Sequence, residues 1–402
     1  MMLLRLALRN LLRNVRRTLA LVFTVAMGTG SLFVFHGFNN GIMNQYRDNT
    51  IHARFGHGQI QTRGYGERVY ERPWEHWIEN PQVLRSELLE LPGVLQVFPR
   101  VEFPALLSSG RITVSGKGQG VDGPEEYKFF NTLNFVAGSN LSSEPDGIVL
   151  GVGMARGLGT AVGDPVTVLV RGSRGEMNRA VLRVTGIFHT GQKEFDDSVF
   201  RIPLKVASRL LETDRVESVA LGLATVEDFP AVAAFISAHH PELEAIPFSV
   251  LDEVYYQHSV DWLDAQFGVI QFIIVAIVVL GIFNTVSTGI LERKQEIGTL
   301  RANGDSRFDI LRLLGLEGLA LGIIGAVLGI ALVMGLDATV LSNGILMPPA
   351  PGITRQFLVM LELTPQMAVT TAALGVSSAL VATLVAGMRV IRMGIAEALR
   401  AW

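Results

Sequence analysis

Four long apolar stretches constrain this chain more than any other feature of its sequence. They cover residues 18–46, 265–291, 313–336 and 364–388, and the only Asp, Glu, Lys or Arg within them is Glu317. A helix needs about 20 mostly apolar residues to cross roughly 30 Å of hydrocarbon, and each stretch is long enough. The mean hydropathy of +0.36 and the charged fraction of 18% are also unlike those of a soluble protein. The sequence therefore predicts a polytopic membrane protein with four transmembrane helices.

Basic residues beside the stretches indicate which ends face the cytoplasm, because cytoplasmic loops carry an excess of Lys and Arg. They gather before the first stretch, between the second and third, and after the fourth: Arg5, Arg9, Arg13, Arg16 and Arg17, then Arg293, Lys294, Arg301, Arg307 and Arg312, then Arg389, Arg392 and Arg400. In residues 337–363 the only Lys or Arg is Arg355, and three prolines prevent a continuous helix, which predicts an outside loop. Residues 292–312 and the tail 389–402 are therefore predicted to be cytoplasmic, and residues 47–264 to lie outside.

Residues 1–17 are predicted to form a cytoplasmic amphipathic helix along the inner membrane surface. Leu4, Leu8, Leu11 and Val15 recur on one helical face, and arginines occupy the other. A cleaved signal peptide is the alternative, since a basic start followed by an apolar stretch is also typical of one. The first apolar stretch is well beyond the roughly 7 to 15 residues of a signal-peptide core, which favours a spanning helix.

Residues 47–264 have the mixed composition of a globular α+β domain that is large enough to bury a core. Periodicity and turn residues predict helices at 81–91, 206–211 and 229–240 and strands at 94–98, 111–121, 165–170, 180–188 and 216–223. Gly172, Ser173 and Gly175 separate two of these strands and indicate a hairpin. We expect two lobes, of which the β-rich one covers about residues 135–200.

No motif in the sequence supports a catalytic role. There is no cysteine, which excludes a disulfide, a thiol nucleophile and a Cys-ligated metal. Gly116 and Lys117 lack the following Ser or Thr and the glycine-rich loop of a nucleotide-binding motif, and His239 and His240 have no evident third metal ligand. The net charge of -3 gives no basis for nucleic acid as a partner. We predict a non-enzymatic chain with no cofactor or metal of its own, so that any ATP and Mg²⁺ would be bound by a partner.

The most specific stretch is residues 284–304, NTVSTGILERKQEIGTLRANG, with Glu317 opening the next span. Its Arg293, Glu296-Ile297-Gly298, Arg301-Ala302 and Gly304 resemble the signature of the FtsX/MacB/LolC-LolE superfamily of ABC transporter permeases. Residues 158–168, 184–188 and 396–400 are similar to the β-rich part of the MacB-like periplasmic core domain and to the C-terminal ending in that family. The layout is most similar to the LolC and LolE lipoprotein-releasing subunits, whereas MacB carries a fused ATPase domain and FtsX a smaller outside domain.

Residues 292–312 alternate in charge between the second and third spans. Taken alone, this pattern is typical of a solvated cytoplasmic loop. The resemblance implies instead a coupling helix that sits in a groove of the ATPase and transmits its closing, with Gly298 and Gly304 marking where it turns back toward the membrane. The residues expected to couple to the ATPase are Glu292, Arg293, Lys294, Glu296, Ile297, Gly298, Arg301, Ala302 and Gly304.

Glycines form a stripe along the third span. Gly315, Gly318, Gly322, Gly325 and Gly329 recur at spacings of three and four and so share one helix face. Small residues let another helix approach closely in lipid, so we expect a packing face, although glycine is also simply frequent in spans. Glu317 lies near the inner end of this span and is expected to form an interfacial salt bridge, with a proton relay as the alternative.

Phenylalanine is frequent in the first two spans. Composition alone is typical of bulk that faces lipid. The resemblance to lipoprotein-releasing subunits implies that the outer halves of these helices form a chamber for acyl chains. The residues expected to line it are Phe33, Phe35, Phe38, Phe267 and Phe272.

Together these expectations describe a permease subunit in the cell inner membrane, with its large domain in the periplasm. The resemblance implies two copies of an ABC ATPase subunit, a second permease subunit that is like or unlike this one, membrane lipid, and a lipoprotein carrier or periplasmic adaptor as partners. ATP binding would shift a two-state equilibrium and move a lipoprotein or other amphiphilic cargo toward the periplasm. Two other functions stay open: FtsX-like mechanical regulation of an extracytoplasmic partner such as a cell-wall hydrolase, and MacB-like export with an adaptor and an outer-membrane channel. A receptor without an ATPase is a further alternative.

Overall fold

The computed structural model describes residues 15–68, 73–131, 133–142, 146–252, 258–348 and 356–392. The chain divides into two compact units. The helical unit comprises residues 1–44, 260–346 and 358–402, and the mixed unit comprises residues 45–259 and 347–357. Most of the mixed unit is therefore an insertion between the first and second long helices.

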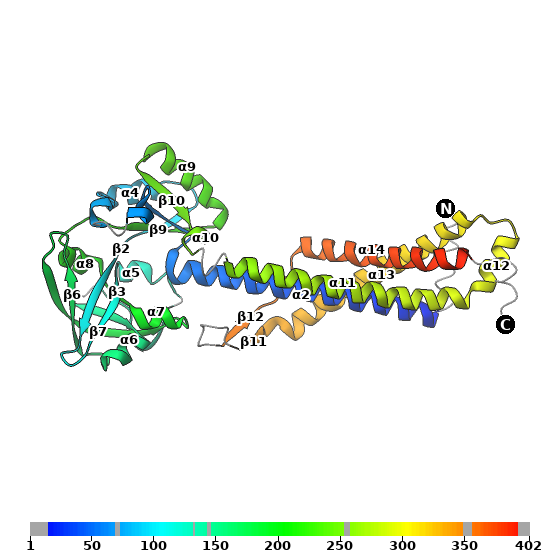
Figure 1. Ribbon diagram of the computed structural model, residues 1–402, viewed down its shortest axis with the longest axis horizontal. Helices are drawn as coiled ribbons and strands as arrows, with labels where there is room; N and C mark the ends of the chain where they lie inside the picture. Colours follow the sequence, from blue (N-terminus) through cyan, green and yellow to red (C-terminus); the bar gives the residue numbers. More distant parts are fainter. Residues whose placement is uncertain are drawn as a thin grey trace. The chain divides into compact units, whose positions relative to one another are not determined.

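Four long helices make up most of the helical unit (Figure 1). They are α2 (Val15–Thr50), α11 (His258–Glu292), α13 (Arg307–Thr339) and α14 (Pro365–Ile391). Each contains a segment long and apolar enough to cross a membrane, with a mean hydropathy between 1.8 and 2.6. The four predicted spans are therefore confirmed. The first helix runs past its predicted end at residue 46, and a π-helix, Ile51–Phe55, follows it.

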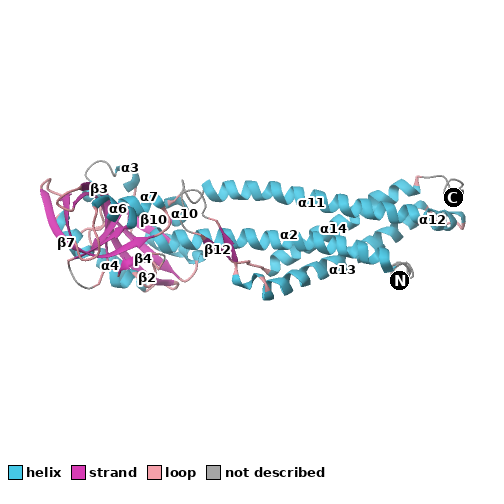
Figure 2. Ribbon diagram, turned by 90° about the horizontal axis from the view of Figure 1, so that it is seen from below, coloured by secondary structure: helices cyan, strands magenta, loops and turns pink. Residues whose placement is uncertain are grey.

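The helical unit has one apolar core. Shorter elements join its long helices: α12 (Lys294–Ala302), η5 (Leu341–Asn343), and the paired strands β11 (Ile345–Met347) and β12 (Phe357–Val359). Figure 2 shows α2, α11, α13 and α14 running alongside one another. Buried side chains from these four helices and from α12 form a single cluster that includes Leu21, Val25, Val278, Ile282, Ile297, Leu314 and Ala382. The short helix α12 is thus part of the packed bundle.

Ten strands form the sheet of the mixed unit. They are β1 (Gly58–Thr62), β2 (Val94–Ser108), β3 (Thr113–Val121), β4 (Asn134–Gly138), β5 (Gly147–Gly151), β6 (Pro165–Arg171), β7 (Met177–His189), β8 (Val199–Pro203), β9 (Ser218–Leu223) and β10 (Leu243–Pro247). Their order is β10-β1-β9-β2-β3-β8-β5-β7-β4, and β6 pairs with both β2 and β7. The strands β2, β3, β8, β5, β7 and β6 therefore close into a ring, which we call the barrel.

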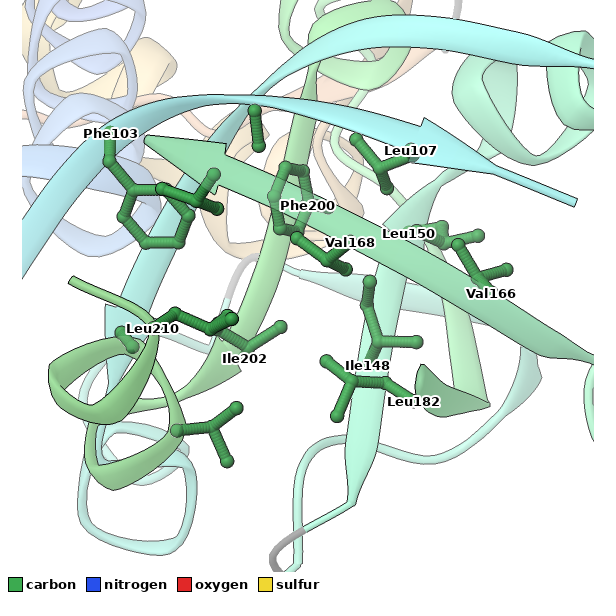
Figure 3. Packing of buried hydrophobic residues seen from close by; sticks show 14 of the residues in the cluster. Phe103, Leu107, Ile148, Leu150, Val166, Val168, Leu182, Phe200, Ile202 and Leu210 are labelled. Carbon is green, nitrogen blue, oxygen red and sulfur yellow. The ribbon is translucent and has the colours of Figure 1, made fainter. Parts of the chain in front are cut away.

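The barrel is closed around apolar side chains that alternate along its strands. Burial alternates with exposure in β6 and in the middle of β7, which is the period of two expected when one face of a strand is covered. The residues that meet in this core include Phe103, Leu107, Ile148, Leu150, Val166, Val168, Leu182, Phe200 and Ile202, with Leu210 of α8 (Leu204–Leu211) against them (Figure 3). Burial of these side chains is the main force that holds the barrel closed.

A second apolar cluster joins β1, β9 and the first part of β2 to the helices α4 (Pro81–Leu89) and α9 (Phe229–His239). Leu84, Leu88, Val232 and Ile236 supply the helical side of this cluster. The remaining short helices are α3 (Tyr65–Arg68), η2 (Pro73–His76), α5 (Gly123–Glu126), α6 (Val152–Leu158), α7 (Lys193–Ser198), η3 (Val226–Asp228) and α10 (Phe248–Leu251). The mixed unit thus has two lobes that share the long strand β2.

The predicted α+β character of the inserted domain is confirmed, and so is the hairpin, which joins β6 and β7. The predicted limits of the β-rich lobe were wrong. The barrel also contains β3 and the later part of β2, because these strands pair with partners far away in the sequence. Residues 1–14 of the predicted amphipathic helix and residues 393–402 of the predicted tail lie outside the described residues.

Candidate functional site

The connection between α11 and α13 is a helix and a tight turn. Arg293 follows the end of α11 with φ −99° and ψ 10°, which departs from helical geometry and separates α11 from α12. After α12, Gly304 has φ 106°, a conformation that favours glycine. A capping box between Ser306 and Asp309 then starts α13. The sequence of breaker, turn and cap fixes where each helix begins and ends.

Arg293 joins α12 to α13. Its Nε donates to Glu296 Oε2 at 3.0 Å, and its Nη1 donates to Glu317 Oε2 at 3.0 Å. Glu317 belongs to α13, and only 5% of its side chain is exposed. A buried carboxylate is costly without a partner, and a guanidinium can serve two carboxylates through separate N–H groups. The salt bridge expected of Glu317 is therefore present, and its partner is Arg293.

The inner side of α12 is attached to the bundle at further points. Ile297 and Gly298 are buried, and Ile297 shares the core of the helical unit with Leu314 of α13. Arg301 Nη1 donates to the carbonyl oxygen of Ile391, the last residue of α14, at 3.3 Å. Gly298 therefore lies in the packed middle of α12, so its predicted place at a turn was wrong.

The outer side of the same segment is exposed. Among the residues predicted to couple to an ATPase, Glu292, Ala302 and Gly304 are exposed, Arg293, Lys294, Glu296 and Arg301 are partly exposed, and Ile297 and Gly298 are buried. The segment thus has one face that packs and one that is open.

Phe308, in the first turn of α13, adds a large apolar surface to this open face. Its side chain is 58% exposed, and the Arg312 guanidinium lies 4.1 Å from the centre of its ring. Phe308 was not predicted to be functional, although a lone phenylalanine between Arg307 and Asp309 in a charged segment was a visible signal. An exposed aromatic residue with an arginine above it is the type of group that anchors protein interfaces.

The glycine stripe of α13 packs against α14 in its first half. A Cβ atom placed on Gly318 would lie 2.5 Å from Thr383 Oγ1, and one on Gly322 would lie 3.2 Å from the Cβ of Ala379. Both distances are shorter than ordinary contacts, so a side chain here would push α14 away. Gly315 is less confined, since its nearest neighbouring atom would be 3.4 Å away.

The second half of the stripe packs against α2. A Cβ atom on Gly325 would lie 2.6 Å from the Cβ of Val25, and one on Gly329 would lie 2.3 Å from the backbone oxygen of Ala26. The absence of side chains at these positions is what lets the two backbones approach so closely. The stripe therefore faces two helices, α14 and α2.

A small cavity lies beside Glu317 in the core of the helical unit. Its volume is ≈ 20 Å³, which is enough for about one water molecule. Its lining is Leu21, Val286, Leu314, Glu317, Gly318, Leu321 and Thr383. Glu317 and Thr383 are the polar residues in this lining. The carboxylate that bonds Arg293 therefore also borders a space large enough for about one water molecule.

The predicted chamber residues differ in exposure. Phe272 is 73% exposed, and Phe38 is partly exposed. Phe35 of α2 and Phe267 of α11 contact each other edge to face, with 5.5 Å between ring centres. Phe33 is only 2% exposed and lies inside the bundle. It presents no surface to a chamber, so its assignment to the chamber wall was wrong.

A chain of hydrogen-bonded polar side chains, of which Gln119 and Arg201 are buried and Glu102 is partly exposed, crosses β2, β3 and β8 in the mixed unit. Glu102, Gln119 and Arg201 lie opposite one another on these adjacent strands. Gln119 Nε2 donates to Glu102 Oε1 at 2.7 Å, and Arg201 Nε donates to Gln119 Oε1 at 3.0 Å. Glu126 accepts from Arg100 Nε at 2.6 Å and also pairs with Arg201. Burial lowers the pKa of Arg201 to about 10, which leaves it charged at neutral pH.

Glu217, just before β9, extends this network. Its carboxylate accepts from the backbone N–H of Glu102 at 2.6 Å and from the Tyr65 hydroxyl at 3.0 Å. The Trp77 indole N–H donates to the Tyr65 hydroxyl at 3.1 Å. Burial and the nearby charge of Glu102 raise the pKa of Glu217 to about 7. The network therefore contains one carboxyl group whose charge changes near neutral pH.

The outer surface of the barrel carries apolar and basic side chains together. Leu169 of β6 lies opposite Leu106 of β2 on one side and Arg179 of β7 on the other. Leu106, Arg179, Val181 and Arg183 are exposed, and Leu169 is partly exposed. We call these five residues the basic barrel face. A surface of this composition is suited to an acidic partner with an apolar centre.

Both units match known protein families. Residues 18–238 match the MacB-like periplasmic core domain, and residues 268–395 match the FtsX-like permease C-terminal. The lipoprotein-releasing system transmembrane protein LolE of Haemophilus influenzae is 28% identical over 346 residues, which cover 80% of this chain and 78% of that protein. The corresponding LolC of Neisseria meningitidis is 24% identical over 326 residues, covering 78% and 75%. The periplasmic region of MacB from Actinobacillus actinomycetemcomitans aligns with a TM-score of 0.36 and 14% identity over 49% of this chain and 90% of that one.

Proposed function

Because the chain belongs to the family of ABC transporter permeases with a MacB-like periplasmic core domain and an FtsX-like C-terminal part, we propose that it moves an amphiphilic cargo with the energy of ATP hydrolysed by a separate subunit. The permease subunits of this family are not themselves catalytic. The chain is a multi-pass inner-membrane protein with its large domain in the periplasm. The similarity to LolE and LolC supports a lipoprotein as the cargo.

The observation that carries this proposal is the two-sided build of α12. Its inner side is bonded to α13 through Arg293 and to α14 through Arg301. Its outer side and the following turn are exposed and end at Phe308. A helix that merely linked two spans would need no such attachment. A helix that receives force from a docked protein needs both an open face and a firm connection to the spans.

The partner on the open face would be an ABC ATPase subunit, and ATP and Mg²⁺ would be bound there. Two such subunits would serve two permease subunits, so that closing of the ATPase pair moves both α12 segments. ATP binding favours the closed ATPase pair, and the difference in affinity between the two states would bias the conformation of the permease. The exposed Phe308 is our candidate for the apolar anchor of this contact.

The cargo would contact α2 and α11 within the membrane. Phe272, Phe35, Phe38 and Phe267 remain our candidates for the wall that contacts acyl chains, and Phe272 offers the largest exposed area among them. A lipoprotein cargo must then pass to a soluble periplasmic carrier. The basic barrel face is our candidate for the carrier contact, because its arginines would attract an acidic carrier and its leucines would bury apolar surface.

Affinity purification from native membranes in mild detergent, followed by mass spectrometry, tests the proposal. We expect the wild-type chain to recover an ABC ATPase subunit together with lipidated peptides. Phe308→Ala should reduce recovery of the ATPase and leave the chain folded. Tyr127→Ala, which removes an exposed aromatic side chain from the mixed unit, is the matched control and should leave recovery unchanged.

The partners recovered separate the proposal from its rivals. Failure of the wild-type chain to recover any ATPase would refute the proposed function. Recovery of an ATPase with a secreted hydrolase would favour mechanical regulation, and recovery with a periplasmic adaptor would favour export. Arg179→Glu with Arg183→Glu should lower recovery of the periplasmic partner alone, because the charges of the basic barrel face would be reversed.

A further inference from the structure

We infer that Arg293 is a positioning residue that makes α12, α13 and α14 move as one body, so that a push on α12 reaches the outer end of α14. This inference rests on the proposed function, because the push would come from the docked ATPase. It goes beyond that function by naming the bond that transmits force and the helices that follow it.

Arg293 lies at a break between α11 and α12 and bonds α12 to α13. Toward α11, the helix is interrupted at Arg293 itself. Toward α13, its guanidinium bonds the buried Glu317, while a second N–H holds Glu296 within α12. Pulling α12 away from α13 would leave the Glu317 carboxylate without its bonded guanidinium in a largely apolar core.

The far end of α12 is also attached, and α13 and α14 pack against each other. Arg301 bonds the last carbonyl of α14, so both ends of α12 are attached to these two helices. Gly318 and Gly322 let α13 and α14 approach so closely that an added Cβ would collide with α14. The three helices are therefore bonded at the cytoplasmic end and closely packed along the spans.

A displacement of α12 at the cytoplasmic end would have to travel along α14 to reach its outer end. Val369 lies in the outer half of α14, 22 residues before Ile391, and its side chain is exposed. At a rise of about 1.5 Å per residue this separation is about 33 Å. A rigid body would carry a displacement of α12 to this position, whereas a loosely attached α12 would absorb it at the cytoplasmic end.

The test uses the natural absence of cysteine from the chain. Val369→Cys is introduced into the full-length chain, and its rate of labelling by a maleimide is measured in the complex with the ATPase, without nucleotide and with ATP and vanadate. Arg293→Gln alone removes the guanidinium that bonds the buried Glu317 and is at risk of misfolding. The main variant is therefore Arg293→Gln with Glu317→Gln, which removes both charges. Arg392→Gln, an exposed arginine at the same membrane side, is the control.

We expect nucleotide to change the labelling rate in the wild-type background and in the Arg392→Gln control. In the Arg293→Gln/Glu317→Gln variant we expect this change to be lost while ATPase binding is retained. A full labelling response in that variant would overturn the inference. Loss of ATPase binding in it would do so too, because the pair would then act in docking. A wild-type chain that binds the ATPase without any response at Val369→Cys would refute the inference alone, whereas a wild-type chain that binds no ATPase would refute the proposed function.

Discussion

Replacing Glu217 with glutamine should change the stability of the mixed unit in opposite directions at low and high pH. The pKa of Glu217 is about 7 in the folded protein and 4.5 for an ordinary glutamate. The folded state therefore binds this proton more tightly than the unfolded state does. The contribution of this bound proton to the free energy of unfolding is fully present below about pH 4.5. It is lost as the pH rises toward 7 and does not change further above that value.

The size of this change in the free energy of unfolding follows from the same two pKa values. Their difference corresponds to on the order of 3 kcal/mol, since each pKa unit is worth about 1.4 kcal/mol. Above pH 7 the wild-type protein loses this free energy because Glu217 is charged, whereas glutamine stays neutral and loses none. It also has one acceptor oxygen, so it can accept from Tyr65 or from the Glu102 N–H but not from both, and the lost hydrogen bond costs about 1 kcal/mol. Glu217→Gln should therefore be more stable than wild type by about 2 kcal/mol at pH 8 and less stable by about 1 kcal/mol at pH 4.

The assay is chemical unfolding of the full-length chain in detergent at several pH values, followed by tryptophan fluorescence, to which the buried Trp77 contributes. Comparing the variant with wild type at each pH removes the contribution of other titrating groups. Glu90→Gln changes an exposed glutamate of the same unit and should show no comparable pH dependence. A difference between Glu217→Gln and wild type that stays constant from pH 4 to pH 8 would show that this carboxyl is not the titrating group.

Substitutions at three other places test the barrel core, a buried ion pair and a contact between two long helices. Phe200→Ala in the barrel core should lower the free energy of unfolding of the mixed unit by about 3–5 kcal/mol in the same assay. Arg100→Ala should lower the free energy of unfolding by up to about 3 kcal/mol, because Glu126 loses its shortest charged hydrogen bonds. The double variant Arg100→Ala with Glu126→Ala should lose less free energy than the sum of the two single variants. Gly329→Ala should lower the melting temperature of the detergent-solubilised chain because its Cβ would collide with the backbone of α2, whereas Gly335→Ala in the same helix meets open space and should not.

The membrane spans could be predicted from the sequence because their requirement is local. A spanning helix must be apolar over its own length, and nothing distant decides this. Some short elements of the mixed unit, such as the β6–β7 hairpin at Gly172, were predictable for the same reason, because they depend on neighbouring residues, whereas β1, β4, β5, β8 and β10 were not predicted. The closure of the barrel was not. It depends on Leu106 facing Leu169 and Lys117 facing Val199, and alternation within one strand does not name its partner.

In the candidate site, too, local features could be predicted from the sequence and the distant partners could not. Arg293 and Glu317 were identified as important from the motif, and an ion pair was expected at Glu317, but its partner depends on how α12 folds back onto α13. Gly298 was misplaced because glycine more often ends a helix than fills a crowded position inside one. Phe33 was misassigned because α2 has neighbours on several sides, so that its sequence has no single apolar stripe to separate core from surface.

The spacing of the glycine stripe keeps it close to one face of α13, although it serves two helices. From Gly315 to Gly329 the glycines alternate in steps of three and four, an average of 3.5 residues, whereas a straight helix turns once in about 3.6. The stripe therefore drifts by about 20° per heptad, or about 40° over its length. Gly318 and Gly329 are 11 residues apart and so point in nearly the same direction around α13. Gly318 nevertheless meets Thr383 of α14 and Gly329 meets Ala26 of α2, so the two neighbouring helices contact the same face of α13 at different positions along its length. One helix face thus fixes α13 to both neighbours, and a displacement that reaches α13 through Arg293 meets α14 before it meets α2.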